Sequence, residues 1–225
     1  MKAMMNVEQA RFNMIEQQIR TWEVLDDRVL RLLALLRRED FVPPQHRALA
    51  FVDMQIPLPP QTHPSQCMLE PKVEARLLQE LALQSDQKVL EIGTGSGYMA
   101  ALMASQARQV ITLEIEPELA RFARGNLKRA GIANVEVREV DGSQGILLDA
   151  PFDAIMVSGA VASVPRHLLE QLKVGGRLAA IVGDQPVMQA TFVTRAEQDG
   201  WRTEQPWDTM APRLKNFPVP SPFTF

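Results

Sequence analysis

Hydrophobic positions recur at helical spacing within residues 1–70. Two amphipathic helices are predicted there, one over 12–19 and one over 29–36, the second after a capping aspartate at Asp26 or Asp27. Their apolar positions are Phe12, Ile15, Ile19, Val29, Leu32, Leu33 and Leu36. The apolar face of each helix is expected to pack either on the rest of the chain or on another chain, and the periodicity leaves both alternatives open.

A proline-rich segment follows these helices. Residues 56–67 (IPLPPQTHPSQC) contain four prolines, which exclude both a helix and a central strand. The four are Pro57, Pro59, Pro60 and Pro64. We therefore expect a rigid, ordered loop or a lid. Pro71 then stands where the first turn of a helix tolerates proline, and the apolar positions of 73–81 share one face of that helix.

From Lys88 onward, short β-rich runs alternate with helical patterns. The runs are 89–92, 110–115, 135–140, 152–157 and 177–182, and the helical patterns are 97–105, 117–130 and 165–172. This βαβ rhythm predicts a doubly wound α/β fold, with a mostly parallel sheet and helices on both faces. Residues 190–196 and 201–209 flank the turn signal Asp199-Gly200, so an antiparallel hairpin is expected to close the sheet.

Composition and charge narrow the class of protein. The chain has 225 residues, 46% of them hydrophobic and 23% charged, which is typical of a folded globular protein. With 24 basic against 27 acidic residues and no long apolar tract, neither a nucleic-acid partner nor a membrane is expected. Cys67 is the one cysteine, and the first residues lack the apolar stretch of a signal peptide, so we expect a cytoplasmic protein. We divide it into a helical extension with a proline-rich loop (1–70) and an α/β core (71–225).

The segment VLEIGTGSGY (89–98) carries the clearest chemical signal. It predicts a buried strand, a turn with Gly93, Gly95 and Gly97, and a helix. Glycine permits a positive φ and lets the backbone approach a ligand at the carboxyl edge of the sheet. The third glycine comes one position too early for the dinucleotide fingerprint, which disfavours a pyrophosphate ligand. A tight connection without a ligand is the alternative interpretation of this turn.

Carboxylates at the ends of successive strands make that alternative less attractive. Glu114 ends the second run close to the spacing of about 20 residues at which an acid binds ribose hydroxyls. Glu91 and Asp141 end the neighbouring runs, so the three acids should face one crevice. Glu116 competes with Glu114 for the ribose, but it precedes Pro117 and suits the start of a helix. A positively charged ligand that carries a ribose, such as S-adenosylmethionine, fits this crevice.

The chain also resembles the protein-L-isoaspartate O-methyltransferase family. The similar segments are VLEIGTGSGY (89–98), LE (113–114), VDG (140–142), PFDAIMVSGA (151–160) and QLKVGGRLAAIVG (171–183), and more weakly REDFVP (38–43) and AFVDMQIPL (50–58). The resemblance implies a seven-stranded methyltransferase fold that binds S-adenosylmethionine and releases S-adenosylhomocysteine. It implies a cofactor site formed by Glu91, Gly93, Thr94, Gly95, Ser96, Gly97, Glu114, Asp141 and Gly142.

The resemblance breaks down in the active-site loop. The family usually has a segment similar to G-Q-T-I-S-x-P, with the serine in the active site. Counting back from Val89 places Leu69 at that serine, whereas counting forward from Gln61 places Pro64 there, next to Ser65. Ser65 is therefore our candidate catalytic residue, because a hydroxyl can donate to an oxyanion without titrating. Thr62, Leu69 and Arg213 are the candidate substrate-binding residues, and no metal site is expected.

Three functions remain open from the sequence. The first is methyl transfer to the carboxylate of L-isoaspartyl residues in damaged proteins or peptides, which is the function that the resemblance implies. The second is methyl transfer to a different carboxylate or a hydroxyl, which the altered loop suggests. The third is a non-catalytic adaptor that binds S-adenosylmethionine. The sequence leaves the oligomeric state undetermined.

Overall fold

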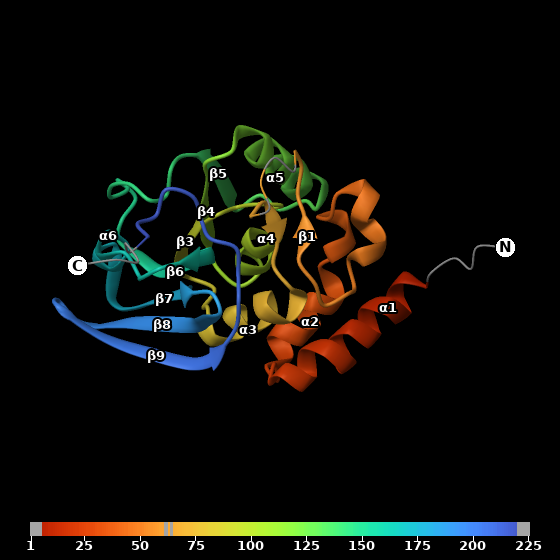
Figure 1. Ribbon diagram of the computed structural model, residues 1–225, viewed down its shortest axis with the longest axis horizontal. Helices are drawn as coiled ribbons and strands as arrows, with labels where there is room; N and C mark the ends of the chain where they lie inside the picture. Colours follow the sequence, from red (N-terminus) through yellow and green to blue (C-terminus); the bar gives the residue numbers. More distant parts are fainter. Residues whose placement is uncertain (1–5, 61–62, 64, 220–225) are drawn as a thin grey trace.

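A seven-stranded sheet forms the centre of the computed structural model, which describes residues 6–60, 63 and 65–219 (Figure 1). Its strands are β3 (Lys88–Ile92), β4 (Gln109–Glu114), β5 (Val135–Glu139), β6 (Phe152–Val161), β7 (Leu172–Asp184), β8 (Val187–Glu197) and β9 (Gly200–Asp208). They follow the order β5-β4-β3-β6-β7-β8-β9. The first five in this order are parallel, and β8 and β9 are antiparallel to their neighbours. The predicted fold and the closing hairpin are confirmed.

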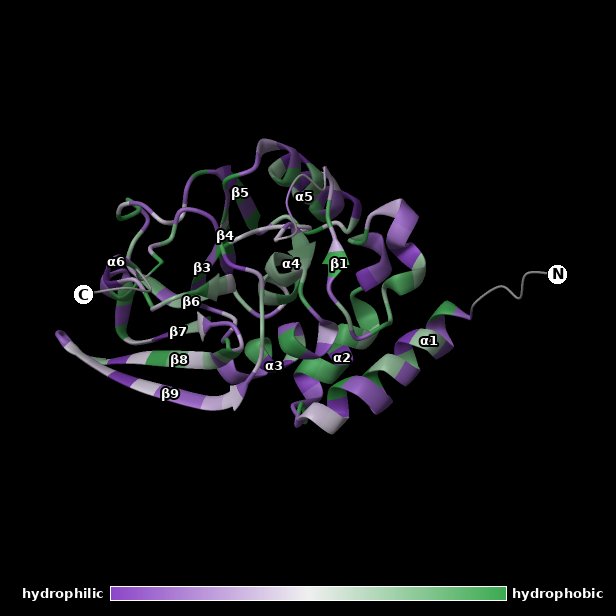
Figure 2. Ribbon diagram, viewed as in Figure 1, coloured by the Kyte–Doolittle hydropathy of each residue, from purple (hydrophilic) through white to green (hydrophobic). Residues whose placement is uncertain are grey.

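The helices divide unequally between the two faces of the sheet. The core helices are α3 (Pro71–Leu81), α4 (Tyr98–Ala104), α5 (Pro117–Arg129) and the short α6 (Arg166–Glu170). Side chains of α3, α4 and α5 join one continuous apolar cluster with Val89, Val110 and Met156 of the strands. The second face packs Leu90, Ile111 and Ile155 against Leu168 of α6 and against loops. Most side chains of the edge strand β9 are exposed, and the strand is mainly hydrophilic, as Figure 2 shows.

The N-terminal helices extend the larger apolar cluster. They are α1 (Val7–Met14), which continues as the π-helix η1 (Ile15–Ile19) and the 3₁₀-helix η2 (Arg20–Trp22), and then α2 (Asp27–Leu35). Ile15 and Ile19 are buried as predicted, but Phe12 is 58% exposed and Met14 is buried in its place. The π-helix has a wider turn than an α-helix, which changes which side chains share a face. The prediction of regular 3.6-residue spacing across 12–19 is therefore wrong.

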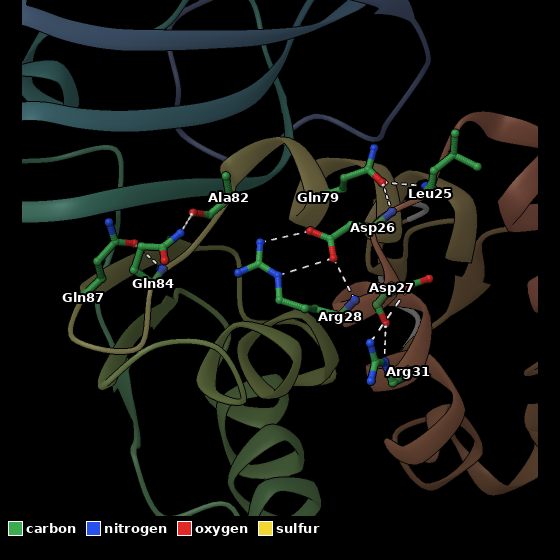
Figure 3. Close-up of polar contacts among 9 residues, drawn as sticks. All are labelled: Leu25, Asp26, Asp27, Arg28, Arg31, Gln79, Ala82, Gln84 and Gln87. Atoms are coloured by element: carbon green, nitrogen blue, oxygen red, sulfur yellow. Dashed lines mark hydrogen bonds and ion pairs between the residues drawn. The ribbon is translucent and has the colours of Figure 1, made fainter.

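Hydrogen bonds from two backbone amides to a glutamine side chain of α3 fix the start of α2 on α3. The Gln79 side chain accepts from the amides of Leu25 and Asp26 at 2.7 and 2.9 Å, as Figure 3 shows. Asp26 is the N-cap, and its carboxylate accepts from the amide of Arg28 at 2.7 Å. One glutamine of α3 thus satisfies two amides that precede a helix and have no partner within it. This contact sets where the N-terminal helices lie on the core.

The segment between α2 and α3 is irregular but well tied to the core. It contains the 3₁₀-helices η3 (Arg38–Asp40) and η4 (Pro44–Leu49), and the short strands β1 (Ile56–Pro57) and β2 (Cys67–Met68). The two strands pair antiparallel at the ends of the proline-rich segment, which the proline pattern did not predict. Each strand is only two residues long, because the prolines deny further pairing. Among the described residues, no helix is long and apolar enough to cross a membrane.

Candidate functional site

A cleft opens at the carboxyl ends of the parallel strands, where the strand order reverses. β3 has β4 on one side and β6 on the other, and ligands of open α/β sheets bind in the crevice at such a switch point. The ends of β3 and β4, the loop after β5 and the segment after β9 contribute to the walls of this cleft. Among its lining residues are Leu58, Ser65, Cys67, Ile92, Gly93, Gly95, Leu113, Glu114, Glu116, Leu119, Val140, Asp141, Gly142, Ser158, Arg213, Leu214, Lys215 and Phe217.

The glycine turn forms one wall of this cleft. Gly93, Gly95 and Gly97 have φ of 92°, 54° and 82°, a region that side chains with a Cβ rarely adopt. The amide of Gly93 donates to the carbonyl of Leu113 at 2.9 Å, which ties the turn to the end of β4. Gly93 and Gly95 line the cleft. Gly97 instead faces α5, where a Cβ would lie 3.3 Å from the side chain of Ala123, so it allows α4 and α5 to pack closely.

Glu114 stands at the end of β4 with its carboxylate facing the cleft. One carboxylate oxygen accepts from the amide of Gly95 at 2.9 Å and the other from the amide of Glu116 at 3.0 Å. Burial raises the pKa of Glu114, although both amides oppose that rise. Glu116 differs because its carboxylate pairs with the Lys215 ammonium at 2.5 Å. Of these two glutamates, Glu114 is therefore the one whose carboxylate oxygens have no cation beside them among the described residues.

Asp141 and Gly142 form the opposite side of the cleft. Burial opposes ionisation of Asp141, but hydrogen bonds from the Asn216 side chain at 2.7 Å and the Ser143 amide at 2.9 Å outweigh it, and the pKa is lowered. A Cβ on Gly142 would come within 2.5 Å of Cγ2 of Ile92. The absence of a side chain at Gly142 thus allows this loop to approach the end of β3.

A smaller cavity adjoins the cleft at the glycine turn. Glu91, Thr94 and Ser96 line it rather than the main cleft. Glu91 is fully buried, and its carboxylate accepts from the hydroxyls of Thr112 at 2.6 Å and Ser158 at 2.7 Å. Burial raises the pKa of Glu91 to about 8 in spite of these hydrogen bonds. Glu91 therefore keeps a proton under conditions where most glutamates have lost theirs.

The candidate substrate residues occupy different places. Ser65 lines the cleft, with its hydroxyl 2.6 Å from Nδ1 of His63. Arg213 also lines the cleft, but its guanidinium donates to the carbonyl of Gly183 at 2.9 Å and pairs with Asp184. Leu69 is buried and faces the smaller cavity. Thr62 lies outside the described residues.

A buried ion pair supports the loop that carries Leu69. The Arg38 guanidinium contacts the Glu74 carboxylate at 3.2 Å and donates to the carbonyls of Leu69 at 2.8 Å and Ala50 at 3.1 Å. Burial raises the pKa of Glu74 to about 7, although Arg38 opposes that rise. Cys67, on the neighbouring strand, lines both the cleft and the smaller cavity, and burial raises its pKa to about 12. Its thiol is therefore protonated at neutral pH.

The segment after β9 supplies a further wall of the cleft. We call residues 211–217 the C-terminal strap. It turns back across the sheet (Figure 1), and the amide of Leu214 donates to the carbonyl of Ala160 at 3.0 Å. Leu214, Lys215 and Phe217 line the cleft, and Asn216 bonds Asp141 from the edge. Only Arg213 of this strap stood out in the sequence, since nothing in its composition marks a ligand site.

Comparison with known proteins agrees with this geometry. The model of the protein-L-isoaspartate(D-aspartate) O-methyltransferase family matches residues 9–210. A protein-L-isoaspartate O-methyltransferase of Myxococcus xanthus is 47% identical over 178 residues, which cover 79% of this chain and 82% of that protein. The corresponding protein of Koribacter versatilis is 40% identical over 187 residues, which cover 83% of this chain and 82% of its own length.

Solved structures show the same fold. A crystal structure from Plasmodium falciparum, described as a protein-L-isoaspartate O-methyltransferase in complex with S-adenosyl-L-homocysteine, has a TM-score of 0.77 and covers 93% of this chain and 98% of its own. It is 20% identical, so this likeness concerns the fold alone. The family model and the curated relatives each span most of the chain, and their similarity extends through both the N-terminal helices and the core. The chain therefore belongs to the protein-L-isoaspartate(D-aspartate) O-methyltransferase family.

Proposed function

We propose that this protein transfers the methyl group of S-adenosylmethionine to the free carboxylate of L-isoaspartyl residues in damaged proteins or peptides. The observation that carries the proposal is the pairing of Glu114 with the glycine turn, at the switch point of a sheet that belongs to this enzyme family. Relatives at 40% and 47% identity bear the name of that activity, which supports the choice of acceptor.

The cleft has the mixed character that this cofactor requires. Apolar side chains in its lining, among them Ile92, Leu119 and Phe217, suit an adenine ring. In the same lining, Glu114 presents carboxylate oxygens that can accept hydrogen bonds from ribose hydroxyls. We assign Asp141 and Gly142 to the base, and Glu91, Thr94 and Ser96 to the support of the turn from below. S-Adenosylmethionine supplies a methyl group bound to a positively charged sulfur.

The chemistry asks little acid–base work of the protein. A free carboxylate with a pKa near 4 is already ionised at pH 7, so no general base is needed to activate it. The residues must align the carboxylate with the methyl group and exclude water, and alignment alone is worth effective molarities of roughly 10⁵–10⁸ M. We propose that Ser65 donates a hydrogen bond to the acceptor carboxylate, with Leu69 beside the substrate chain. Arg213 can bind the carboxylate only if it releases Asp184.

The experiment that tests this function uses two matched peptides, one with an isoaspartyl residue and one with a normal aspartyl residue. Methyl transfer from radiolabelled S-adenosylmethionine is measured on both, and cofactor binding is measured by calorimetry on the same preparation. We expect transfer to the isoaspartyl peptide alone. A Ser65→Ala variant should lower the rate without changing cofactor affinity, whereas Thr203→Ala, which removes an exposed hydroxyl of β9, serves as the control. Cofactor binding without transfer to either peptide would refute the proposed acceptor.

A second candidate function has one observation in its favour. Leu69, which the count back from Val89 aligns with the family serine, is 5% exposed and offers no hydrogen-bond donor from its side chain. A methyltransferase of this fold that acts on another carboxylate or on a hydroxyl would fit such a change. Transfer of label from S-adenosylmethionine to a small-molecule pool, and none to isoaspartyl peptides, would select this alternative. Tight cofactor binding with no acceptor at all would indicate an adaptor.

A further inference from the structure

A second groove lies where the N-terminal segment meets α5, apart from the cofactor cleft. Its core wall consists of Arg121, Phe122, Gly125 and Arg129, which recur at helical spacing on one face of α5. Its other wall comes from the segment around η3 and η4 and consists of Asp40, Val42, Pro44 and Arg47. The groove holds about 370 Å³, within the roughly 300–1,000 Å³ typical of small-molecule sites. Such sites occur preferentially where two parts of a protein meet.

The charges in this groove are unbalanced. Three guanidinium groups, those of Arg47, Arg121 and Arg129, face one carboxylate, that of Asp40. Asp40 already pairs with Arg37 at 3.3 Å, outside the groove. In the part of the chain that the structure describes, neither Arg47 nor Arg121 forms an ion pair, whereas Arg124 on the same helix pairs with Glu139 at 2.5 Å. The chain as a whole has a formal charge of −3, so this concentration of positive charge is a local exception.

The floor of the groove is apolar and open. Phe122 is half-buried there, next to Val42 and Pro44. Gly125 lies in the interior of α5, where glycine destabilises a helix relative to alanine. A Cβ at that position would lie 3.4 Å from Nη1 of Arg129, whose other terminal nitrogen donates to Oδ1 of Asn126. A ligand in this groove would meet positive charge at the rim and an aromatic ring below it.

We propose that this groove binds a small organic phosphate, with the phosphate held by Arg47, Arg121 and Arg129 and an apolar or aromatic part packed on Phe122. Three guanidinium groups against one carboxylate leave two positive charges, which match the charge of about −1.5 to −2 that a phosphate monoester carries at pH 7. The planar guanidinium forms two parallel hydrogen bonds with phosphate oxygens, which favours arginine over lysine at such sites. The proposal is independent of the methyl acceptor.

Phenyl phosphate is a suitable probe, because it combines both features of the proposed ligand. In a titration followed by amide NMR signals, we expect saturable shifts at Phe122 and Gly125. The double variant Arg47→Gln/Arg121→Gln should bind at least tenfold more weakly. Arg202→Gln removes an exposed arginine of β9 and should bind like the unaltered protein. Inorganic phosphate and phenol, each with half of the ligand, should both bind more weakly than phenyl phosphate.

Three results would overturn the proposal. One is affinity that stays unchanged in the double variant. Another is a set of shifts spread over arginines and lysines elsewhere on the surface, which would indicate general attraction of anions. The third is phenol binding as tightly as phenyl phosphate, since the arginines would then contribute nothing. All variants change exposed side chains, and thermal unfolding of each one establishes that a loss of binding is not a loss of fold.

Discussion

Replacing Glu91 with glutamine should remove a pH dependence from the stability of this protein. Glu91 is fully buried between Thr112 and Ser158, and burial raises its pKa from the usual 4.5 to about 8. Between those two pH values the folded protein keeps a proton that the unfolded chain has lost. The contribution of Glu91 to stability is therefore complete below about pH 4.5 and is lost as the pH rises to about 8.

The size of the effect follows from the two pKa values. Each pKa unit corresponds to about 1.36 kcal/mol, so the whole change amounts to roughly 5 kcal/mol. A glutamine at this position has nearly the same shape, can keep hydrogen bonds to both hydroxyls, and does not titrate. Between pH 5.5 and 7.5 the free energy of unfolding of the unaltered protein should therefore fall by about 3 kcal/mol relative to that of Glu91→Gln.

Urea unfolding of both proteins at pH 5.5, 6.5 and 7.5 measures this difference. Glu197→Gln, which removes an exposed glutamate at the tip of the β8–β9 hairpin, controls for the loss of one acidic residue from the chain. The other buried acids titrate alike in both proteins, so they cancel in the comparison. Parallel stability curves for Glu91→Gln and the unaltered protein would refute the reasoning, because they would mean that Glu91 is ionised in the folded state across this range.

Three further changes test other parts of the structure. Glu114→Gln should weaken cofactor binding by roughly 1–3 kcal/mol, the cost of poorly matched polar groups, as measured by calorimetry; an unchanged dissociation constant would contradict the ribose assignment. Gly142→Ala should lower the free energy of unfolding in urea by about 1–3 kcal/mol, because the new Cβ meets Cγ2 of Ile92 at 2.5 Å. Arg38→Leu should lower that free energy by about 3–5 kcal/mol, since it leaves the Glu74 carboxylate buried without its cation. A second change, Glu74→Leu, should restore much of this loss, and a double variant no more stable than Arg38→Leu would argue against that cause.

The sequence predicts the sheet well because its strands are local signals. Runs of buried β-formers separated by helical patterns located all seven strands, with the two of the hairpin recognised from Asp199-Gly200. Strand ends were less predictable. β6 continues through Ser158 to Val161, past its apolar run, since these residues pair with β7 after a shift in register. Phe12 shows a different limit, because the π-helix that exposes it has no signature in the spacing of apolar residues.

The candidate site also has a part that the sequence predicts and a part that it does not. Gly93, Gly95 and Glu114 belong to one strand–turn–helix–strand pattern, so the amino-acid sequence alone places them together. Lys215 and Asn216 reach the cleft through contacts with Glu116 and Asp141, which lie 99 and 75 residues earlier in the chain. Pairs at such separations depend on how the whole sheet is assembled, and no pattern in one sequence reports them.

The position of the C-terminal strap also sets a time at which the cleft can form during synthesis. Leu214 packs against Gly93 and Gly159. All the strands after β3 are synthesised between Gly93 and Leu214, so Leu214 leaves the ribosome only after them. At about 5–20 residues per second, that interval lasts roughly 6–24 seconds. During it, the end of β3 and the glycine turn lack one of their walls. A nascent chain therefore exposes apolar surface at the future site, where a chaperone can bind, and it gains its full affinity for a ligand only when the strap closes.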